Sequence, residues 1–220
     1  MIEAILPAGV AVEEAFADES GASLLSEEAE VVGRAVEKRR DEFATGRACA
    51  HRALRRLGVE AGPIGSGERG EPLWPAGVVG SITHCDGYRG SAVARGGELL
   101  TIGIDAERHQ PLPVGLIEDV ARPEERPRLA ELAGAVPAVH WDRLLFSAKE
   151  SVYKAWFPLA RRWLGFEDAT LTLDPQRGRF AARLLVPGPV VDGSELRGFE
   201  GRWLVADGLV LTAIAPVART

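Results

Sequence analysis

Two acidic side chains directly follow a short apolar segment in the middle of the chain. The segment Leu99–Ile104 is typical of a β-strand, and Asp105 and Glu107 come at its end. Because side chains alternate between the two faces of a strand, both acids share the face opposite Ile104. Two such carboxylates repel each other unless a cation lies between them, and Mg²⁺ suits the pair because it prefers oxygen ligands. An acidic strand end that is simply solvated has the same pattern. Other residues are therefore needed to distinguish a metal site from a solvated strand end.

A third carboxylate, Glu150, lies within residues 139–162, where apolar residues recur at steps of three and four and predict a helix. The core stripe of this helix contains Trp141, Leu145, Ala148, Val152 and Ala155. Glu150 belongs to a neighbouring stripe with Phe146, Tyr153 and Phe157, so we expect it to be partly covered. A buried carboxylate needs a partner. Lys154, four residues later, supplies either a local ion pair or a second group for an anionic ligand.

Basic residues are concentrated in two parts of an acidic chain. The 220 residues carry a net charge of −6, which argues against general nucleic-acid binding. Residues 1–33 contain eight acidic and no basic residues, whereas residues 34–56 contain eight basic and three acidic ones. Residues 143–163 contain five basic residues and one acidic residue. This distribution predicts either a specific anionic ligand or two solvated helix faces.

The elements that position these residues follow from periodicity and turn signals. Helical signals run from Ser26 to Leu57, with a break expected near Thr45-Gly46 and a cap at Gly58. Asp86-Gly87 and Gly96-Gly97 are hairpin signals. They predict a three-strand meander of Val78–Cys85, Tyr88–Arg95 and Glu98–Asp105.

The second half of the chain has the same order of elements. We expect a short helix around Glu124–Leu132 before the helix at 139–162. Strands are expected at Ala169–Leu173, Arg179–Val186, Phe199–Ala206 and Leu209–Val217, and one more near the N-terminus at Glu3–Leu6. Helix followed by meander thus occurs twice, in residues 26–107 and 139–217. Asp105 and Glu107 lie at the junction, where ligand clefts commonly form.

Cysteine content and apolar run lengths bear on the cellular setting. Cys49 and Cys85 form no Cys-x-x-Cys motif, and the chain is too long for a disulfide scaffold. Apolar runs are shorter than a membrane span, and the N-terminus is acidic rather than basic. We therefore expect a cytoplasmic location and no membrane attachment.

Four motifs, in order and at suitable separations, resemble those of the 4′-phosphopantetheinyl transferases. Gly103–Glu107 resembles (I/V)G(I/V)DxE, and Phe146–Ala155 resembles (F/W)xxKE(A/S)xxK. Val79–Cys85 resembles the upstream (S/T)-H strand, and Gly70-Glu71-Pro72 resembles the G-(K/E)-P element. The longer blocks Trp141–Ala155 and Trp163–Ala169 are similar to the Sfp-type, actinobacterial branch that is close to enterobactin-synthetase component D. The resemblance covers roughly residues 35–173.

This resemblance implies a fold and a reaction. The implied fold is a pseudo-dimer of two α+β halves, residues 1–107 and 108–220, each a helix with a small antiparallel three-strand sheet. The active site would lie at their interface, in agreement with the two helix-and-meander blocks. The implied enzyme, a holo-[acyl-carrier-protein] synthase, moves the phosphopantetheine arm of coenzyme A to a serine of an acyl or peptidyl carrier protein. It releases adenosine 3′,5′-bisphosphate and uses Mg²⁺, with Mn²⁺ as the alternative.

The resemblance also implies roles at the reacting end of coenzyme A. The metal would be held by Asp105, Glu107 and Glu150, with the Ala106 carbonyl nearby. Lys149 and Lys154 would neutralise the pyrophosphate as it becomes the leaving group. Glu150 is also the candidate base for the serine hydroxyl, and the nearby cations favour its ionised form at neutral pH.

Other residues would contact the nucleotide end. Arg39, Arg47 and His84 would face the 3′-phosphate, and Thr83 would lie beside the phosphates. A loop of Ser66, Gly67, Glu68 and Arg69 would cover the nucleotide, although relatives often have Lys where this chain has Ser66.

Partners and alternative functions complete the expectations. Carrier proteins of this class present an acidic helix, which the two basic segments would attract. Fatty-acid, polyketide, peptide and siderophore synthesis all use such carriers, and the fused halves favour a monomer. One alternative is a Mg²⁺-dependent nucleotide phosphohydrolase. Another is a non-catalytic module that binds coenzyme A or carrier proteins.

Overall fold

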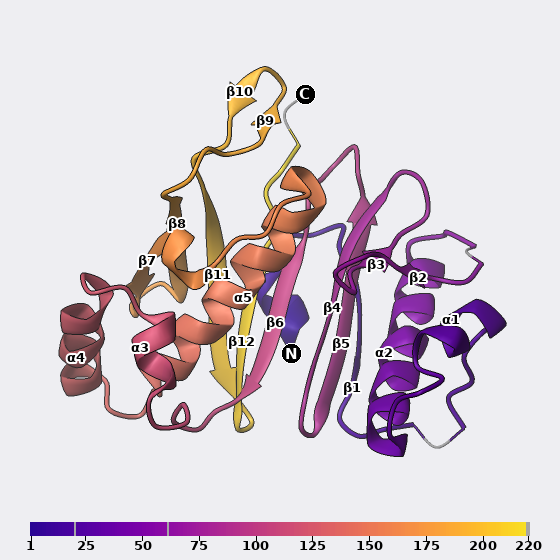
Figure 1. Ribbon diagram of the computed structural model, residues 1–220, viewed down its shortest axis with the longest axis horizontal. Helices are drawn as coiled ribbons and strands as arrows, with labels where there is room; N and C mark the ends of the chain where they lie inside the picture. Colours follow the sequence, from indigo (N-terminus) through magenta and orange to yellow (C-terminus); the bar gives the residue numbers. More distant parts are fainter. Residues whose placement is uncertain (20, 61, 219–220) are drawn as a thin grey trace.

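Two antiparallel sheets, each packed against one long helix, form the computed structural model (Figure 1). The structure describes residues 1–19, 21–60 and 62–218. The first sheet packs against α2 (Glu37–Arg56) and has the order β1 (Ala11–Ala15), β5 (Tyr88–Arg95), β4 (Val78–Cys85). The second packs against α5 (Trp141–Ala160) and has the order β6 (Gly103–Arg108), β12 (Leu209–Ile214), β11 (Gly198–Ala206), β8 (Arg179–Leu184), β7 (Ala169–Asp174). The predicted α+β class is confirmed, but the sheets have three and five strands instead of three each.

Shorter elements surround these layers. They are η1 (Ile2–Ile5), α1 (Ser26–Val31), α3 (Leu116–Val120), α4 (Glu125–Ala135), η2 (Phe166–Asp168) and the small hairpins β2 (Gly65–Ser66) with β3 (Pro72–Leu73) and β9 (Val190–Val191) with β10 (Ser194–Glu195). The described residues contain no helix that is both long and apolar enough to cross a membrane.

The third strand of the predicted meander is wrong in both position and partner. β6 begins at Gly103 instead of Glu98, and it pairs with β12 of the second sheet. The Gly96-Gly97 signal suggested a hairpin, but Leu99 instead forms a bridge with Val217, near the other end of the chain. Sheet pairing therefore groups the Asp-x-Glu motif with the second half, and we propose that the boundary between the halves lies before residue 103.

Two hydroxyl groups join the two sheets where β4 and β6 lie side by side (Figure 1). Ser81 Oγ accepts a hydrogen bond from the Ile104 N–H at 3.2 Å, and Thr83 Oγ1 accepts one from the Ala106 N–H at 3.0 Å. Side chains of β4 thus satisfy amides of β6 that a strand ladder would otherwise satisfy.

Two further expectations from the sequence are corrected. Thr45 and Gly46 lie inside α2 and are buried, and the helical break falls between α1 and α2 instead. The helix continues through Thr45, whose hydroxyl accepts the Glu19 N–H at 3.0 Å. The expected strand Glu3–Leu6 is replaced by η1, whose Ile2 and Ile5 are both buried three residues apart.

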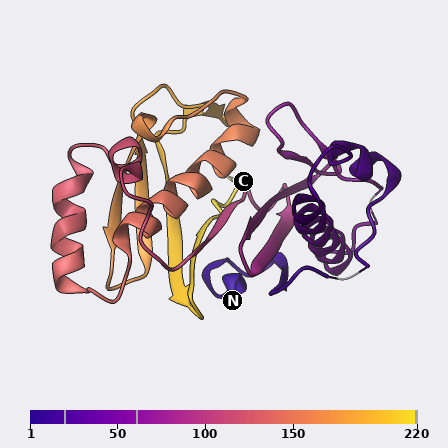
Figure 2. The same cartoon turned by 60° about the horizontal axis from the view of Figure 1, so that its bottom comes forward.

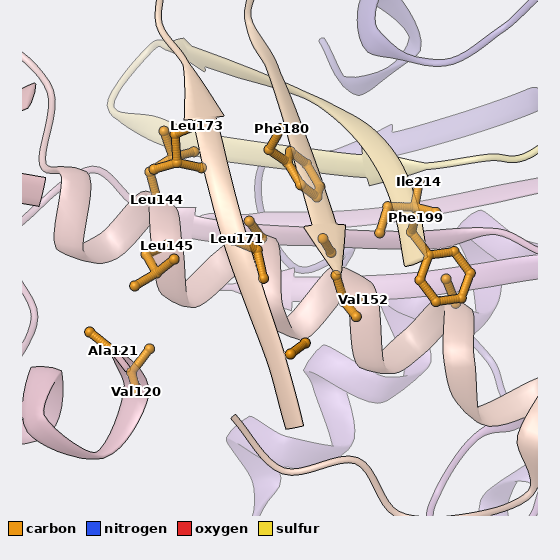
Figure 3. Packing of buried hydrophobic residues seen from close by; sticks show 14 of the residues in the cluster. Val120, Ala121, Leu144, Leu145, Val152, Leu171, Leu173, Phe180, Phe199 and Ile214 are labelled. Atoms are coloured by element: carbon orange, nitrogen blue, oxygen red, sulfur yellow. The ribbon is translucent and has the colours of Figure 1, made fainter. Parts of the chain in front are cut away.

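The largest hydrophobic core lies between α5 and the second sheet (Figure 3). All members of the predicted core stripe are buried: Trp141, Leu145, Ala148, Val152 and Ala155. They meet residues of β7, β8, β11 and β12, among them Leu171, Phe180, Phe199 and Ile214. Each fully buried large side chain of this kind contributes about 1.5–3 kcal/mol, so this core fixes α5 firmly on its sheet.

A separate core lies between the two sheets, where Figure 2 shows the N-terminal segment between the two halves. Ile2 and Ile5 pack there with Tyr88 of the first sheet and Leu211 of the second. The halves are therefore held together by apolar contacts as well as by the β4–β6 hydroxyl groups.

Gly103 lets α5 lie directly on β6. A Cβ atom at this position would lie 2.1 Å from the Ser151 carbonyl oxygen and 2.6 Å from the Ala155 nitrogen. These are main-chain atoms of the helix, so only glycine permits the contact. The motif glycine thereby sets the distance between the carboxylate strand and the Lys-Glu helix.

Candidate active site

Asp105 lies at the centre of the site and is 5% exposed. Its Oδ1 accepts hydrogen bonds from Lys154 Nζ at 2.7 Å and from Thr83 Oγ1 at 3.4 Å. Lys154 also donates to the Ile104 carbonyl at 3.0 Å. Asp105 Oδ2 is buried and has no partner among the described residues. Since a buried, unpartnered carboxylate oxygen is unfavourable, Oδ2 is an acceptor that remains for a ligand.

Glu107 lies two residues further along the same strand, and its Oε2 accepts a hydrogen bond from Arg143 Nη1 at 2.8 Å. Burial raises the pKa of Glu107 to about 7, the charge of Asp105 adds to the rise, and Arg143 opposes it. Glu107 therefore shares the electrostatic environment of Asp105.

Glu150 reaches the same region from α5. Burial and then the charge of Asp105 raise its pKa, and Lys154 only partly opposes them. The expectation that nearby cations lower this pKa is thus reversed in the protein alone. All three predicted metal ligands lie close enough for Asp105 to affect the other two.

The three carboxylates fit Mg²⁺ in chemistry, since they are oxygen donors and Asp105 Oδ2 lacks a partner. They are not gathered as a coordination shell: among the described residues, no three His, Cys, Asp or Glu side chains are arranged to hold a metal ion. Cationic groups instead contact two of them, Lys154 at Asp105 and Arg143 at Glu107.

Lys149 was predicted to lie beside the pyrophosphate, but in the protein without ligand its contacts are with other groups. Its Nζ lies 2.8 Å from Glu125 Oε2 and donates to the carbonyls of Val120, Phe166 and Ala169. The side chain is buried, and its pKa is lowered by that burial. Lys149 is a structural group that connects α5 to α4 and η2.

Thr83 also differs from its expected role. It is 1% exposed, and its hydroxyl contacts Asp105, Lys154 and the Ala106 N–H. Thr83 thus braces the carboxylate strand and presents little surface to a phosphate.

The predicted 3′-phosphate residues come together on the first half of the molecule. Arg39, Arg47 and His84 line one cavity of about 120 Å³. Arg39 Nη1 is in hydrogen-bond contact with His84 Nε2, and Glu42 lies 3.6 Å from Arg39 and 4.0 Å from His84. Burial, followed by the Arg39 charge, lowers the pKa of His84. Two guanidinium groups against the single carboxylate of Glu42 give this cavity a net positive charge.

Arg47, which lines this cavity, is only 4% exposed. Its Nη2 donates to Ser66 Oγ at 3.0 Å and to the Gly65 carbonyl at 3.3 Å. Burial lowers its pKa to about 10, and its Nε has no partner among the described residues. An unpartnered N–H on a buried cation is suited to an incoming anion.

The predicted nucleotide loop joins β2 to β3 and reaches across to the second half. The Gly67 N–H donates to the Glu71 carbonyl at 2.8 Å, which closes the turn. The Arg69 guanidinium lies 5.8 Å from the Trp163 ring centroid, and Glu71 pairs with Arg161 at 3.1 Å. Ser66 contacts Arg47, whereas Glu68 lines neither of the two cavities between which the loop runs.

A cleft of about 380 Å³ lies between the halves under this loop. Its walls come from the loop, β4 and α5, and they include Arg69, Trp74, Glu150, Tyr153 and Lys154. A neighbouring cavity of about 240 Å³, lined mainly by apolar residues, shares Glu150 and Tyr153 with the cleft. The space thus runs from the loop past Glu150 into an apolar recess, which suits an extended ligand.

Two charged residues that contact predicted site residues were absent from the sequence-based prediction. Arg143 precedes Glu150 by seven residues, two helical turns, and this spacing places both on one side of α5. No sequence pattern indicated Glu125. Its partner Lys149 was expected to contact the pyrophosphate, so no buried acidic partner for Lys149 was predicted.

Comparison with known proteins follows the same two-part division. Residues 27–94 match the 4′-phosphopantetheinyl transferase N-terminal domain, and residues 101–193 match the 4′-phosphopantetheinyl transferase superfamily. The chain is 58% identical to 4′-phosphopantetheinyl transferase Svp of Streptomyces mobaraensis, over 99% of this chain and 90% of that protein. It is 48% identical to 4′-phosphopantetheinyl transferase PptT of Mycobacterium tuberculosis, over 97% of each chain.

A more distant relative extends the comparison. Enterobactin synthase component D of Salmonella typhimurium is 34% identical over 83% of this chain and 74% of that protein. The resemblance inferred from four short motifs is confirmed along nearly the whole sequence. With both domain families matched in order and relatives aligned almost end to end, this chain belongs to the 4′-phosphopantetheinyl transferase superfamily.

Proposed function

We propose that this enzyme transfers the 4′-phosphopantetheine arm of coenzyme A to a serine hydroxyl of an acyl or peptidyl carrier protein. The observation that carries the proposal is the buried Asp105, whose Oδ1 pairs with Lys154 and whose Oδ2 remains unpartnered at the junction of the two halves. The cleft beside it continues into an apolar recess on one side and lies near a cationic cavity on the other.

Asp105, Glu107 and Glu150 would hold a divalent cation, Mg²⁺ or Mn²⁺, with the carbonyl of Ala106 nearby. When bound, the ion would neutralise charge on the pyrophosphate. The N–H of Ala106 is held by Thr83, and Asp105 is held by Lys154, so these residues orient the carboxylate strand for that ligand.

The covalent step joins the serine oxygen to the phosphorus that carries the pantetheine arm. The bond from this phosphorus to the bridging oxygen breaks, and adenosine 3′,5′-bisphosphate leaves with the electron pair. Lys154 offsets the charge that develops on the leaving group. Glu150, whose pKa is raised, accepts the serine proton directly or through a water.

The nucleotide end would be bound by the first half. Arg39, Arg47 and His84 would contact the 3′-phosphate in their cavity, and Arg69 would cover the nucleotide from the loop. The carrier protein would be attracted by the exposed basic residues at the start of α2, such as Lys38 and Arg40. The cytoplasmic location and the monomeric state stay predictions.

Mass spectrometry of an apo carrier protein tests this function. After incubation with the enzyme, coenzyme A and Mg²⁺, we expect a mass gain of one phosphopantetheine group, and none when a chelator replaces Mg²⁺. Breakdown of coenzyme A without carrier modification would favour the phosphohydrolase. Intact coenzyme A and unmodified carrier proteins of several types would favour a binding module.

A further inference from the structure

The guanidinium of Arg143 reaches from the first turn of α5 to the end of β6. Arg143 is 8% exposed. Its Nε donates to the Gln110 carbonyl at 3.1 Å, its Nη2 donates to the Pro111 carbonyl at 3.0 Å, and its Nη1 donates to Glu107 Oε2 at 2.8 Å. The donors of one rigid planar group are thus fixed in three directions.

The carbonyls that hold Arg143 are anchored independently of Glu107. They belong to the segment that follows β6, and the next N–H in that segment, from Leu112, donates to Asp142 Oδ2 at 2.8 Å. Asp142 is the neighbour of Arg143 on α5. The position of the guanidinium is therefore set by the junction of this segment with the helix, and Glu107 binds to a group that is already fixed.

Glu107 needs such a partner because it lies near another carboxylate. Asp105 is two residues away on the same face of β6, and its charge opposes that of Glu107. Only one Glu107 oxygen is used by Arg143; Oε1 takes no hydrogen bond within the described part of the chain.

We propose that Arg143 is a positioning residue for metal binding. It holds Glu107 Oε2, offsets the repulsion from Asp105, and leaves Oε1 available to a divalent cation. This inference rests on the proposed role of Glu107 as a metal ligand. Partners that orient a metal ligand typically change metal affinity by about 10–100-fold when they are removed.

Binding of Mn²⁺, measured from the electron paramagnetic resonance signal of the free ion with coenzyme A at saturation, tests the proposal directly. We expect Arg143→Met to raise the Mn²⁺ dissociation constant by about 10–100-fold. Arg143→Lys should have a smaller effect, because it keeps the charge but cannot reach all three acceptors. A sample of coenzyme A and Mn²⁺ without protein corrects for binding to the nucleotide alone.

Arg126→Met is a matched control. Arg126 also donates to two main-chain carbonyls, those of Ala121 and Glu118, but contacts no carboxylate within the described residues. It should therefore share any loss of stability without sharing the loss of Mn²⁺ affinity. Where Arg143→Met does not fold, Arg143→Lys and the rate at increasing Mg²⁺ give the answer: rescue at high Mg²⁺ supports a positioning role.

Glu107→Gln separates this inference from the proposed function. Weakened Mn²⁺ binding in both Glu107→Gln and Arg143→Met supports the metal-ligand role of Glu107 and the positioning role of Arg143. Weakened binding in Glu107→Gln with unchanged binding in Arg143→Met overturns the role of Arg143 and leaves the metal site in place. Unchanged binding in both variants overturns the metal-ligand role of Glu107, and the role of Arg143 with it.

Discussion

Burial, and then the charge of Asp105, raises the pKa of both Glu107 and Glu150. At the scale of single residues, the site is therefore a group of three carboxylates whose negative charges repel one another. Lys154 and Arg143 each offset part of this repulsion from a fixed direction. A metal ion placed among them would relieve the rest.

Asp105→Asn should remove most transfer activity while leaving the fold intact. The amide keeps the size of the side chain and can still accept a hydrogen bond from Lys154, but it removes the charge beside the proposed metal. Loss of one preorganised electrostatic group typically lowers kcat by about 10²–10³-fold. The carrier modification rate, together with an unchanged circular dichroism spectrum, checks this; near-normal turnover at ordinary Mg²⁺ concentration would remove Asp105 from the metal site.

Glu107 predicts a pH dependence of stability in metal-free protein. Its pKa is raised from 4.5 to about 7 by burial and by Asp105. The folded chain holds this proton more tightly than the unfolded chain, so the group stabilises the fold fully below about pH 4.5, and this contribution is lost as the pH rises through about 7.

The unfolding free energy of the wild type, relative to Glu107→Gln, should therefore fall by roughly 1–3 kcal/mol between about pH 4.5 and pH 8. Urea unfolding of both proteins at several pH values measures the difference. A difference that stays constant with pH would mean that Glu107 titrates as in the unfolded chain.

At the scale of elements, the site depends on how closely α5 lies on β6. Gly103→Ala would place a methyl group 2.1 Å from the Ser151 carbonyl oxygen, so the helix must shift. We expect a loss of about 1–3 kcal/mol or more and a weaker Asp105–Lys154 contact.

Thermal unfolding with Gly97→Ala as the control measures the effect. A Cβ atom at Gly97 would meet nothing within 4 Å, so this variant should keep the melting temperature of the wild type. Equal melting temperatures for the two variants would show that α5 tolerates the methyl group.

Lys149→Met separates the structural role of Lys149 from the catalytic one that its motif suggests. The substitution leaves Glu125 buried without its cation, which typically destabilises a protein by about 3–5 kcal/mol. Chemical denaturation should show this loss, and Glu125→Gln in the same chain should restore part of it. At a temperature where the variant is folded, KM for coenzyme A should change little; a large rise would return Lys149 to the phosphate site.

The contrast between β5 and β6 shows which elements the sequence could predict. The β4–β5 hairpin was predicted with its observed bounds, because alternation and the Asp86-Gly87 turn are local signals. The partner of β6 is β12, about a hundred residues further along the chain, and no local pattern indicates it. Non-local pairing is therefore the part of the fold that periodicity missed.

Prediction of the site was likewise limited where a side chain's partner comes from a distant part of the chain. The resemblance to the transferase motifs implied that Asp105, Glu150 and Lys154 lie together, and in the structure Lys154 contacts Asp105, whose charge also affects Glu150. The spacing of Lys149 also held a second signal: it lies four residues after Leu145 and three before Val152, next to the core stripe, and it is buried. The family motif implied a role at the pyrophosphate for Lys149, whereas the helical spacing indicated a buried position.

At the scale of the whole molecule, the two halves present different chemistry to the space around the cleft. The first half supplies the cationic cavity of Arg39, Arg47 and His84, and the second supplies the Lys-Glu helix and the apolar recess. Arg39→Ala and His84→Ala should therefore weaken coenzyme A binding by about 1.5–3 kcal/mol each while affecting dephospho-coenzyme A, which lacks the 3′-phosphate, much less.

Calorimetric titration of both ligands measures these losses. Arg128→Ala is a suitable control, because Arg128 lies on α4 in an exposed pair with Glu131, away from the cavity. Equal losses on both ligands would mean that Arg39 and His84 maintain the structure and do not bind the 3′-phosphate.

The hydroxyl contacts between β4 and β6 have a consequence for the motion of the halves. The amide protons of Ile104 and Ala106 are held only by Ser81 and Thr83 of the opposite sheet, within the described residues. These two protons exchange with deuterium in the solvent when the halves separate, whereas the ladder between β6 and β12 protects amides through contacts inside one half. The exchange rates of these two protons therefore report how often the two halves separate. A ligand that bridges the two halves should slow both exchange rates together.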